Sequence, residues 1–131
     1  MSPAAAQPAA AASPVPSLEP VRFDVLPGAV AVDRPPVRIF LGTEPAQHRA
    51  ERVFFYSLRK VRHPGRVYEV YRMTRLPGFA KGRWRTGFTN FRFAIPDLAG
   101  RQGRAIYNDV DEIYLADPAE LFDLPMGEAG Y

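Results

Sequence analysis

Apolar residues recur at two spacings in the middle of the chain, and these spacings predict a strand, a helix and a second strand. Residues 37–41 are rich in β-branched and aromatic side chains and precede Gly42, which predicts a buried strand. Residues 46–61 carry apolar or small side chains every three to four positions, which predicts an amphipathic helix that ends before Pro64. Residues 67–73 alternate and predict a second strand, so the three elements favour a βαβ unit and a parallel sheet. The predicted buried face of the helix comprises Ala50, Val53, Phe54, Ser57, Leu58 and Val61.

The pattern beyond residue 74 predicts a loop followed by shorter elements. Residues 75–88 are rich in Gly and Arg without a period, so we expect a loop. Residues 89–98 predict a short helix, and residues 104–110 predict a third strand. Asp117 and Pro118 have the residue types of a helix N-cap and a first helical position. Together the elements predict an α/β fold with a mostly parallel, Rossmann-like sheet flanked by helices.

Composition changes the picture for the first quarter of the chain. Residues 1–36 hold eight of the fourteen prolines, and seven alanines precede Ser13. Because such a segment buries too little apolar surface to offset its ordering entropy, we expect residues 1–36 to be disordered. Residues 37–131 would then form one domain.

The sequence lacks the signals of a membrane or secreted protein. No apolar run reaches about 18 residues, and no basic region precedes the alanines near the N-terminus. Cysteine is absent, which excludes disulfides and thiolate metal ligands. We therefore expect a cytoplasmic protein without a membrane span.

Charge is distributed unevenly along the chain. Residues 37–105 contain fifteen basic and four acidic residues, whereas residues 106–131 contain seven acidic residues and no basic one. A basic surface attracts phosphate groups, whereas a carboxylate cluster repels them unless a cation lies between. The two regions are typical either of a metal-bridged phosphate ligand or of a solvated surface dipole.

The third predicted strand ends in two carboxylates, Asp109 and Asp111, which are the main candidates for chemistry. Alternation along a strand would place both on one side, at the edge where open α/β sheets bind ligands. Two carboxylates suit Mg²⁺ or Mn²⁺, whose remaining ligands are commonly phosphate oxygens. An EF-hand loop is excluded because its sixth position would be Tyr114 rather than Gly. A phosphatase of the haloacid dehalogenase type and a pair of surface acids without function both remain open.

The segment 103–124 as a whole resembles the family-8 glycosyltransferases, which include glycogenin and the bacterial lipopolysaccharide glucosyl- and galactosyltransferases. The resemblance rests on the Asp-x-Asp at a strand end, the short segment 112–116 and a helix that opens with Asp-Pro-Ala-Glu. Upstream, residues 92–98 resemble the segment whose basic residue faces the sugar nucleotide, and residues 37–43 resemble the first strand of the family. The order and spacing agree over about 95 residues.

The resemblance implies a GT-A fold and a UDP-sugar donor bound with Mn²⁺ or Mg²⁺. It also implies transfer of a hexose, with retention of anomeric configuration, to a carbohydrate or lipopolysaccharide-type acceptor. Asp109 and Asp111 would ligate the metal, and Arg92 would lie near the donor phosphate or sugar. The base pocket would be lined by Gly42, Thr43 and Glu44.

Members of that family extend past the point that corresponds to Tyr131, and their later half supplies the acceptor site and a third metal ligand, a His. Here the histidines His48 and His63 precede the carboxylate pair, and we expect both at the surface. The resemblance therefore implies the nucleotide-binding half of a transferase, incomplete at its C-terminus and with little activity alone.

A nucleic-acid-binding module is the alternative from a different class. Residues 81–93 interleave basic and aromatic side chains, as single-stranded nucleic-acid binders do. The acidic residues 106–131 oppose this interpretation, so we expect no nucleic-acid partner. Nucleic-acid binding would weaken steeply with salt, whereas metal-bridged UDP binding would depend on the divalent cation.

Overall fold

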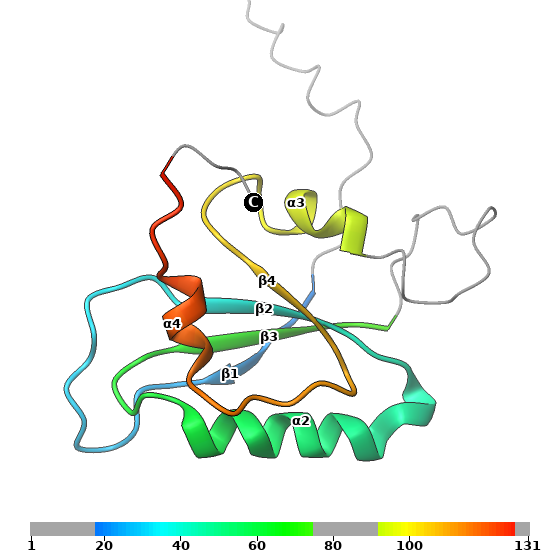
Figure 1. Cartoon of the computed structure of the whole chain (residues 1–131), viewed down its shortest axis with the longest axis horizontal. Coiled ribbons are helices and arrows are strands. Elements are labelled where there is room, and N and C mark those ends of the chain that lie inside the picture. Colours follow the sequence, from blue (N-terminus) through cyan, green and yellow to red (C-terminus); the bar gives the residue numbers. More distant parts are fainter. Residues whose placement is uncertain (1–17, 75–91, 128–131) are drawn as a thin grey trace, which may run out of the picture.

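The computed structural model describes residues 18–74 and 92–127, which form a four-stranded mixed sheet with helices on both faces (Figure 1). The strands are β1 (Val21–Phe23), β2 (Val37–Gly42), β3 (Tyr68–Met73) and β4 (Ile106–Asp109), in the order β1-β3-β2-β4. β2 pairs parallel with both β3 and β4, while β1 pairs antiparallel with β3. The predicted α/β class is therefore confirmed, with a sheet that is parallel except at its β1 edge.

The predicted βαβ unit is confirmed as β2, the short 3₁₀ helix η2 (Pro45–Gln47), α2 (His48–Val61) and β3. α2 ends at Val61 because the backbone of Arg62 is extended. The buried face differs from the prediction, since Phe55 is buried and Val53 is 53% exposed. Phe55 is buried because its ring stacks on Phe23 of β1, with 6.0 Å between the ring centroids.

The two faces of the sheet bury separate apolar clusters. On one face, Phe54 and Leu58 of α2 pack with residues of β2 that include Ile39 and Leu41. On the other face, Phe40 and Met73 pack with residues of the short helix α3 (Ile95–Leu98). Successive side chains of β2 therefore enter the two clusters in turn, and α2 and α3 cover opposite faces of the sheet (Figure 1).

The predicted disorder is wrong for residues 18–36, which are part of the fold. β1 belongs to the sheet, and the side chain of Phe23 is buried. The backbone N–H groups of Leu26 and Val32 donate to carbonyls of the turn after α2, both at 2.8 Å. Proline removes only its own donor, so the other backbone groups of this segment remain free to pair. Residues 1–17 lie outside the described residues.

The later elements are shorter than predicted. The third strand is β4 rather than residues 104–110, because a turn begins at its last residue, Asp109. α3 confirms the end of the helix predicted over residues 89–98. Residues 89–91 of that predicted helix and the loop predicted at 75–88 lie outside the described part of the chain. α4 (Pro118–Phe122) begins as predicted, since the side chain of Asp117 accepts from the N–H of Ala119 at 2.9 Å.

None of the helices in the described ranges is long and apolar enough to cross a membrane.

Candidate functional site

β2 and β4 end side by side, and the residues that follow them form the candidate site. Gly42 pairs with Asp109 in the parallel register, and the N–H of Val110 donates to the carbonyl of Gly42 at 3.0 Å. From β2 the chain passes through α2 to β3 on one side, whereas β4 lies on the other side of β2. Because the strand order reverses at β2, the carboxyl ends of β2 and β4 flank a topological switch point, where open α/β sheets bind ligands.

Asp109 and Asp111 stand on either side of a buried residue. Val110 is 2% exposed, and both aspartates are exposed. The N–H of Glu112 donates to the carbonyl of Asp109 at 3.0 Å, which closes a turn over residues 109–112. We call residues 109–112 the carboxylate turn. Asp111 lies in this turn rather than in the strand, where the alternation of the sequence predicts it. Both carboxylates remain at the surface, because Val110 fills the core position between them.

Tyr107 and Arg92 add a hydroxyl and a positive charge to the surroundings of Asp109. The Tyr107 hydroxyl donates to Asp109 Oδ1 at 2.7 Å. Burial raises the pKa of Tyr107, the hydrogen bond to Asp109 raises it further, and the positive charge of Arg92 lowers it. The positive charge of Arg92 therefore acts on the Tyr107 hydroxyl. The Arg92 guanidinium also lies 5.4 Å from the centre of the Phe93 ring.

The residues after β2 are held by a polar chain of their own. Thr43 is fully buried, and its hydroxyl donates to Glu51 Oε2 at 3.2 Å. The other oxygen of Glu51 accepts from the guanidinium of Arg72, near the end of β3. Gly42 is buried, and Glu44 is half-buried just before η2. Sequence reasoning missed Glu51 and Arg72, because an acid and a base 21 positions apart form no local pattern.

The chemistry of the donors fits a cation that shares its ligands between protein and phosphate. In the described ranges 18–74 and 92–127, no three His, Cys, Asp or Glu side chains form a group that could hold a metal ion. Mg²⁺ nevertheless takes one or two protein carboxylates where substrate phosphates complete its shell, and Asp109 and Asp111 have that chemistry. His48 and His63 are exposed at the two ends of α2 and lie on neither β4 nor the carboxylate turn.

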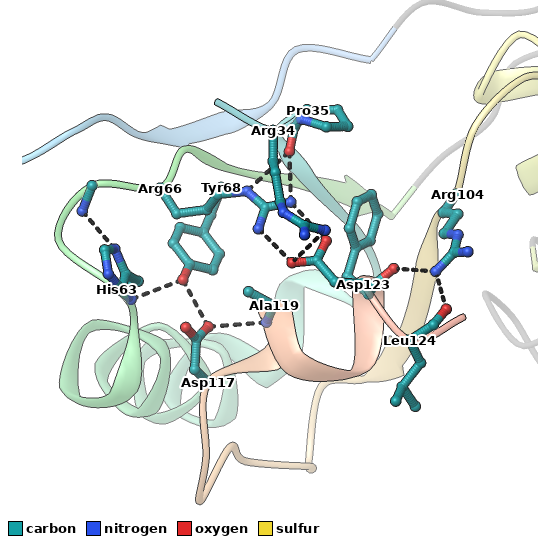
Figure 2. Close-up of polar contacts among 12 residues, drawn as sticks. Arg34, Pro35, His63, Arg66, Tyr68, Arg104, Asp117, Ala119, Asp123 and Leu124 are labelled. Carbon is teal, nitrogen blue, oxygen red and sulfur yellow. Dashed lines mark hydrogen bonds and ion pairs between the residues drawn. The ribbon is translucent and has the colours of Figure 1, made fainter. Parts of the chain in front are cut away.

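A buried arginine that no sequence pattern singles out fixes α4 against the sheet (Figure 2). Arg66, whose side chain is 3% exposed, donates to both carboxylate oxygens of Asp123 at 2.8 and 3.0 Å. It also donates twice to the carbonyl of Pro35, at 2.9 and 3.0 Å. The Arg66 guanidinium holds the pKa of the Asp123 carboxyl below its usual range.

Tyr68 ties the start of α4 to β3 (Figure 2). Its hydroxyl donates to Asp117 Oδ1 at 2.7 Å and accepts from the N–H of His63 at 2.8 Å. At the other end of α4, Arg104 donates to the carbonyl of Phe122 at 2.8 Å. These contacts hold the chain that follows the carboxylate turn, so the turn is anchored both by β4 and by α4.

Most of the basic and aromatic segment 81–93 lies outside the described residues. Only Arg92 and Phe93 of this segment belong to the described part. The absence of a nucleic-acid partner therefore stays a prediction.

Protein CDI of Arabidopsis thaliana is 34% identical to the chain over 100 residues. The match covers 70% of this chain and 38% of Protein CDI, so the chain spans well under half the length of that relative. No protein-family model matches the chain, and no solved structure matches it.

The resemblance to the family-8 glycosyltransferases is therefore wrong, since the curated match is to Protein CDI and no family model of a glycosyltransferase matches. The GT-A likeness of the fold is likewise not confirmed by any structural neighbour. An Asp-x-Asp at a strand end, followed by a helix, is a layout that any α/β sheet with a switch point can carry. The motif order alone was too general to identify a family.

Proposed function

We propose that the chain is a nucleotide-sugar-binding module of a metal-dependent glycosyltransferase, which holds the diphosphate of a UDP-sugar through Mn²⁺ or Mg²⁺ at Asp109 and Asp111. The observation that carries the proposal is the in-register pairing of Gly42 with Asp109 at the switch point. The exposed carboxylates follow one strand end, and residues 42–44 follow the other. A diphosphate and its base would therefore be held from two neighbouring strands.

The roles of the residues follow from their charges and places. Asp109 and Asp111 would supply the protein oxygens for the cation, which when bound neutralises charge on the diphosphate leaving group. Arg92 would direct a further positive charge to the phosphates, and its electrostatic effect on Tyr107, whose hydroxyl donates to Asp109, supports that role. Residues 42–44 would contact the base. Transfer of a hexose to a carbohydrate acceptor is part of the same proposal.

The test is calorimetric titration of the full chain with UDP, in Mn²⁺ and in chelator. We expect Mn²⁺ to raise the affinity for UDP about tenfold or more, and UDP to raise the affinity for Mn²⁺ by the same factor. Asp109→Ala or Asp111→Ala should abolish this coupling. Glu120→Ala is the matched control, because Glu120 is an exposed acid on α4. Asp123 is unsuitable as a control, because its carboxylate pairs with buried Arg66.

Two outcomes would contradict the proposal. Equal affinity for UDP in Mn²⁺ and in chelator would show that no metal ion connects the carboxylates to the diphosphate. A loss of coupling in Glu120→Ala as large as in Asp109→Ala would show that the overall negative charge of the chain, rather than the carboxylate turn, controls binding. In either case Asp109 and Asp111 are surface acids at a strand end.

A further inference from the structure

Glu112 binds both backbone groups of Asp109. Its own N–H donates to the Asp109 carbonyl at 3.0 Å, and its Oε1 accepts from the Asp109 N–H at 2.8 Å. The same Oε1 also accepts from Asn108 Nδ2 at 3.0 Å. One carboxylate oxygen thus holds the residue that ends β4 and the residue before it, and it does so from within the turn.

A chain of hydrogen bonds continues from Asn108 to α2. The hydroxyl of Tyr114 donates to Asn108 Oδ1, and the backbone N–H of Tyr114 donates to Ser57 Oγ at 3.0 Å. Ser57 is a buried residue of α2, and its hydroxyl donates in turn to the carbonyl of Phe54 at 2.7 Å. Burial raises the pKa of Tyr114, so its hydroxyl remains a donor. The carboxylate turn is therefore connected to the buried face of a long helix.

This arrangement has an electrostatic cost that needs a reason. Residues 109, 111 and 112 are acidic and lie within four consecutive positions, and like charges at short range repel each other. The repulsion favours a turn that opens, whereas the chain of hydrogen bonds holds it closed. A turn held in advance loses no further freedom when a cation binds, and this raises the affinity.

We propose that Glu112 is a positioning residue, which fixes Asp109, the residue at the end of β4 that the proposed function assigns to the cation, and that Asn108, Tyr114 and Ser57 connect Glu112 to α2. The proposal rests on the proposed function, because it assigns the purpose of the turn. Glu112 acts through the backbone of Asp109 and is not itself a metal ligand.

The two roles of Glu112 predict different results for a conservative substitution. In Glu112→Gln the amide oxygen can still accept from the two N–H donors, but a charged metal ligand would be lost. In Glu112→Ala both the hydrogen bonds and the charge are lost. A positioning residue is therefore rescued by Gln, whereas a metal ligand is not.

The experiment measures the coupling between UDP and Mn²⁺ by calorimetry on the full chain. We expect Glu112→Ala to reduce the coupling about tenfold, as the loss of an outer-shell partner does, and Glu112→Gln to stay within about twofold of the wild type. The affinity for UDP in chelator and the melting temperature should change little, which separates positioning from a general structural role. Amide hydrogen exchange at Asp109 should be faster in Glu112→Ala and unchanged in Glu112→Gln. Glu120→Ala is again the control.

A second variant tests the chain from its far end. Tyr114→Phe keeps the ring, which lies 5.5 Å from Phe54 between centroids, and removes the hydroxyl that holds Asn108. We expect it to reduce the coupling by a smaller factor than Glu112→Ala, and it remains informative if the alanine variant does not fold.

Each outcome decides the matter. Equal loss in Glu112→Gln and Glu112→Ala would make Glu112 a ligand, and full coupling in both Glu112→Ala and Tyr114→Phe would make the hydrogen bonds irrelevant; either result overturns the positioning role and leaves the proposed function standing. A wild-type chain that is folded and shows no coupling overturns the proposed function and this inference with it.

Discussion

The lack of space between Gly65 and the backbone of Val30 predicts that Gly65→Ala is severely destabilising. A Cβ added at Gly65 would lie 2.1 Å from the carbonyl oxygen of Val30 and 3.2 Å from its carbonyl carbon. An ordinary carbon–oxygen contact is about 3.3 Å, so the segment before β2 and the turn after α2 would have to separate by roughly 1 Å. Because the neighbouring atom is backbone rather than a flexible side chain, no rotamer change relieves the overlap.

The magnitude follows from what that separation breaks. Two backbone hydrogen bonds join the segments, from Leu26 to Pro64 and from Val32 to Gly65, both at 2.8 Å. Each is worth about 1 kcal/mol net, and forcing atoms into a packed site costs about 1–3 kcal/mol. The expected loss is about 3 kcal/mol or more, which lowers the melting temperature of a domain of about 100 residues by more than about 10 °C.

Thermal unfolding followed by circular dichroism measures this loss. The control is Gly28→Ala, because Gly28 has φ +84° and open space around its missing Cβ, so that substitution costs only the left-handed strain of about 1–2 kcal/mol. Hydrogen exchange at Leu26 and Val32 should be faster in Gly65→Ala than in Gly28→Ala. If the two variants melt at the same temperature, the close approach at Val30 does not exist and the reasoning fails.

Three further predictions concern the polar contacts of the fold. Arg66 lowers the pKa of Asp123 in the folded state, so the ionised carboxylate stabilises the fold above its unfolded pKa of about 3.9, and this stabilisation is lost as the pH falls through the folded pKa. Asp123→Asn should therefore lower the free energy of unfolding at pH 7 and reduce its further decrease in acid, which urea titrations at several pH values would measure. Tyr68→Phe should cost about 1–3 kcal/mol in urea unfolding, because the N–H of His63 loses its acceptor, and no loss would remove Tyr68 from the network. The Arg38 guanidinium donates to the carbonyls of Ala99, Gln102 and Arg104, so Arg38→Lys should speed hydrogen exchange in the segment 99–104 and leave β3 unchanged; an equal change in both regions would contradict this role.

The βαβ unit could be predicted because its signals are local. β2, α2 and β3 follow each other along the chain, and each shows the period of its own element. β1 could not be predicted in the same way, because its three residues lie in a proline-rich segment and are stabilised by pairing with β3, far along the chain. The error about Phe55 has the same origin, since the partner of its ring is Phe23 of β1.

The candidate site divides along the same line. Asp109 and Asp111 could be selected from sequence because they stand two positions apart at the end of an apolar segment, whereas the pairing of Asp109 with Gly42 is given by the structure. The turn that takes Asp111 out of the strand could not be found, because it depends on the side chain of Glu112 folding back onto the backbone of Asp109. The role of Arg66 could not be predicted for a related reason, since its partner Asp123 lies 57 positions later in the chain.

The order of the strands also determines how the molecule comes apart. β4 pairs with β2 across the long stretch of chain from Gly42 to Asp109, whereas β3 pairs with β2 across about half that length, and each doubling of a closed loop adds about 0.6 kcal/mol of entropic cost. β4 is also a four-residue strand with a single partner in the described part of the sheet. Elements of that kind open at lower free energy than the core around them. We therefore expect the carboxylate turn to detach in a partial unfolding step that leaves α2 and β3 intact, so that binding at Asp109 would be lost at a denaturant concentration below the midpoint of global unfolding.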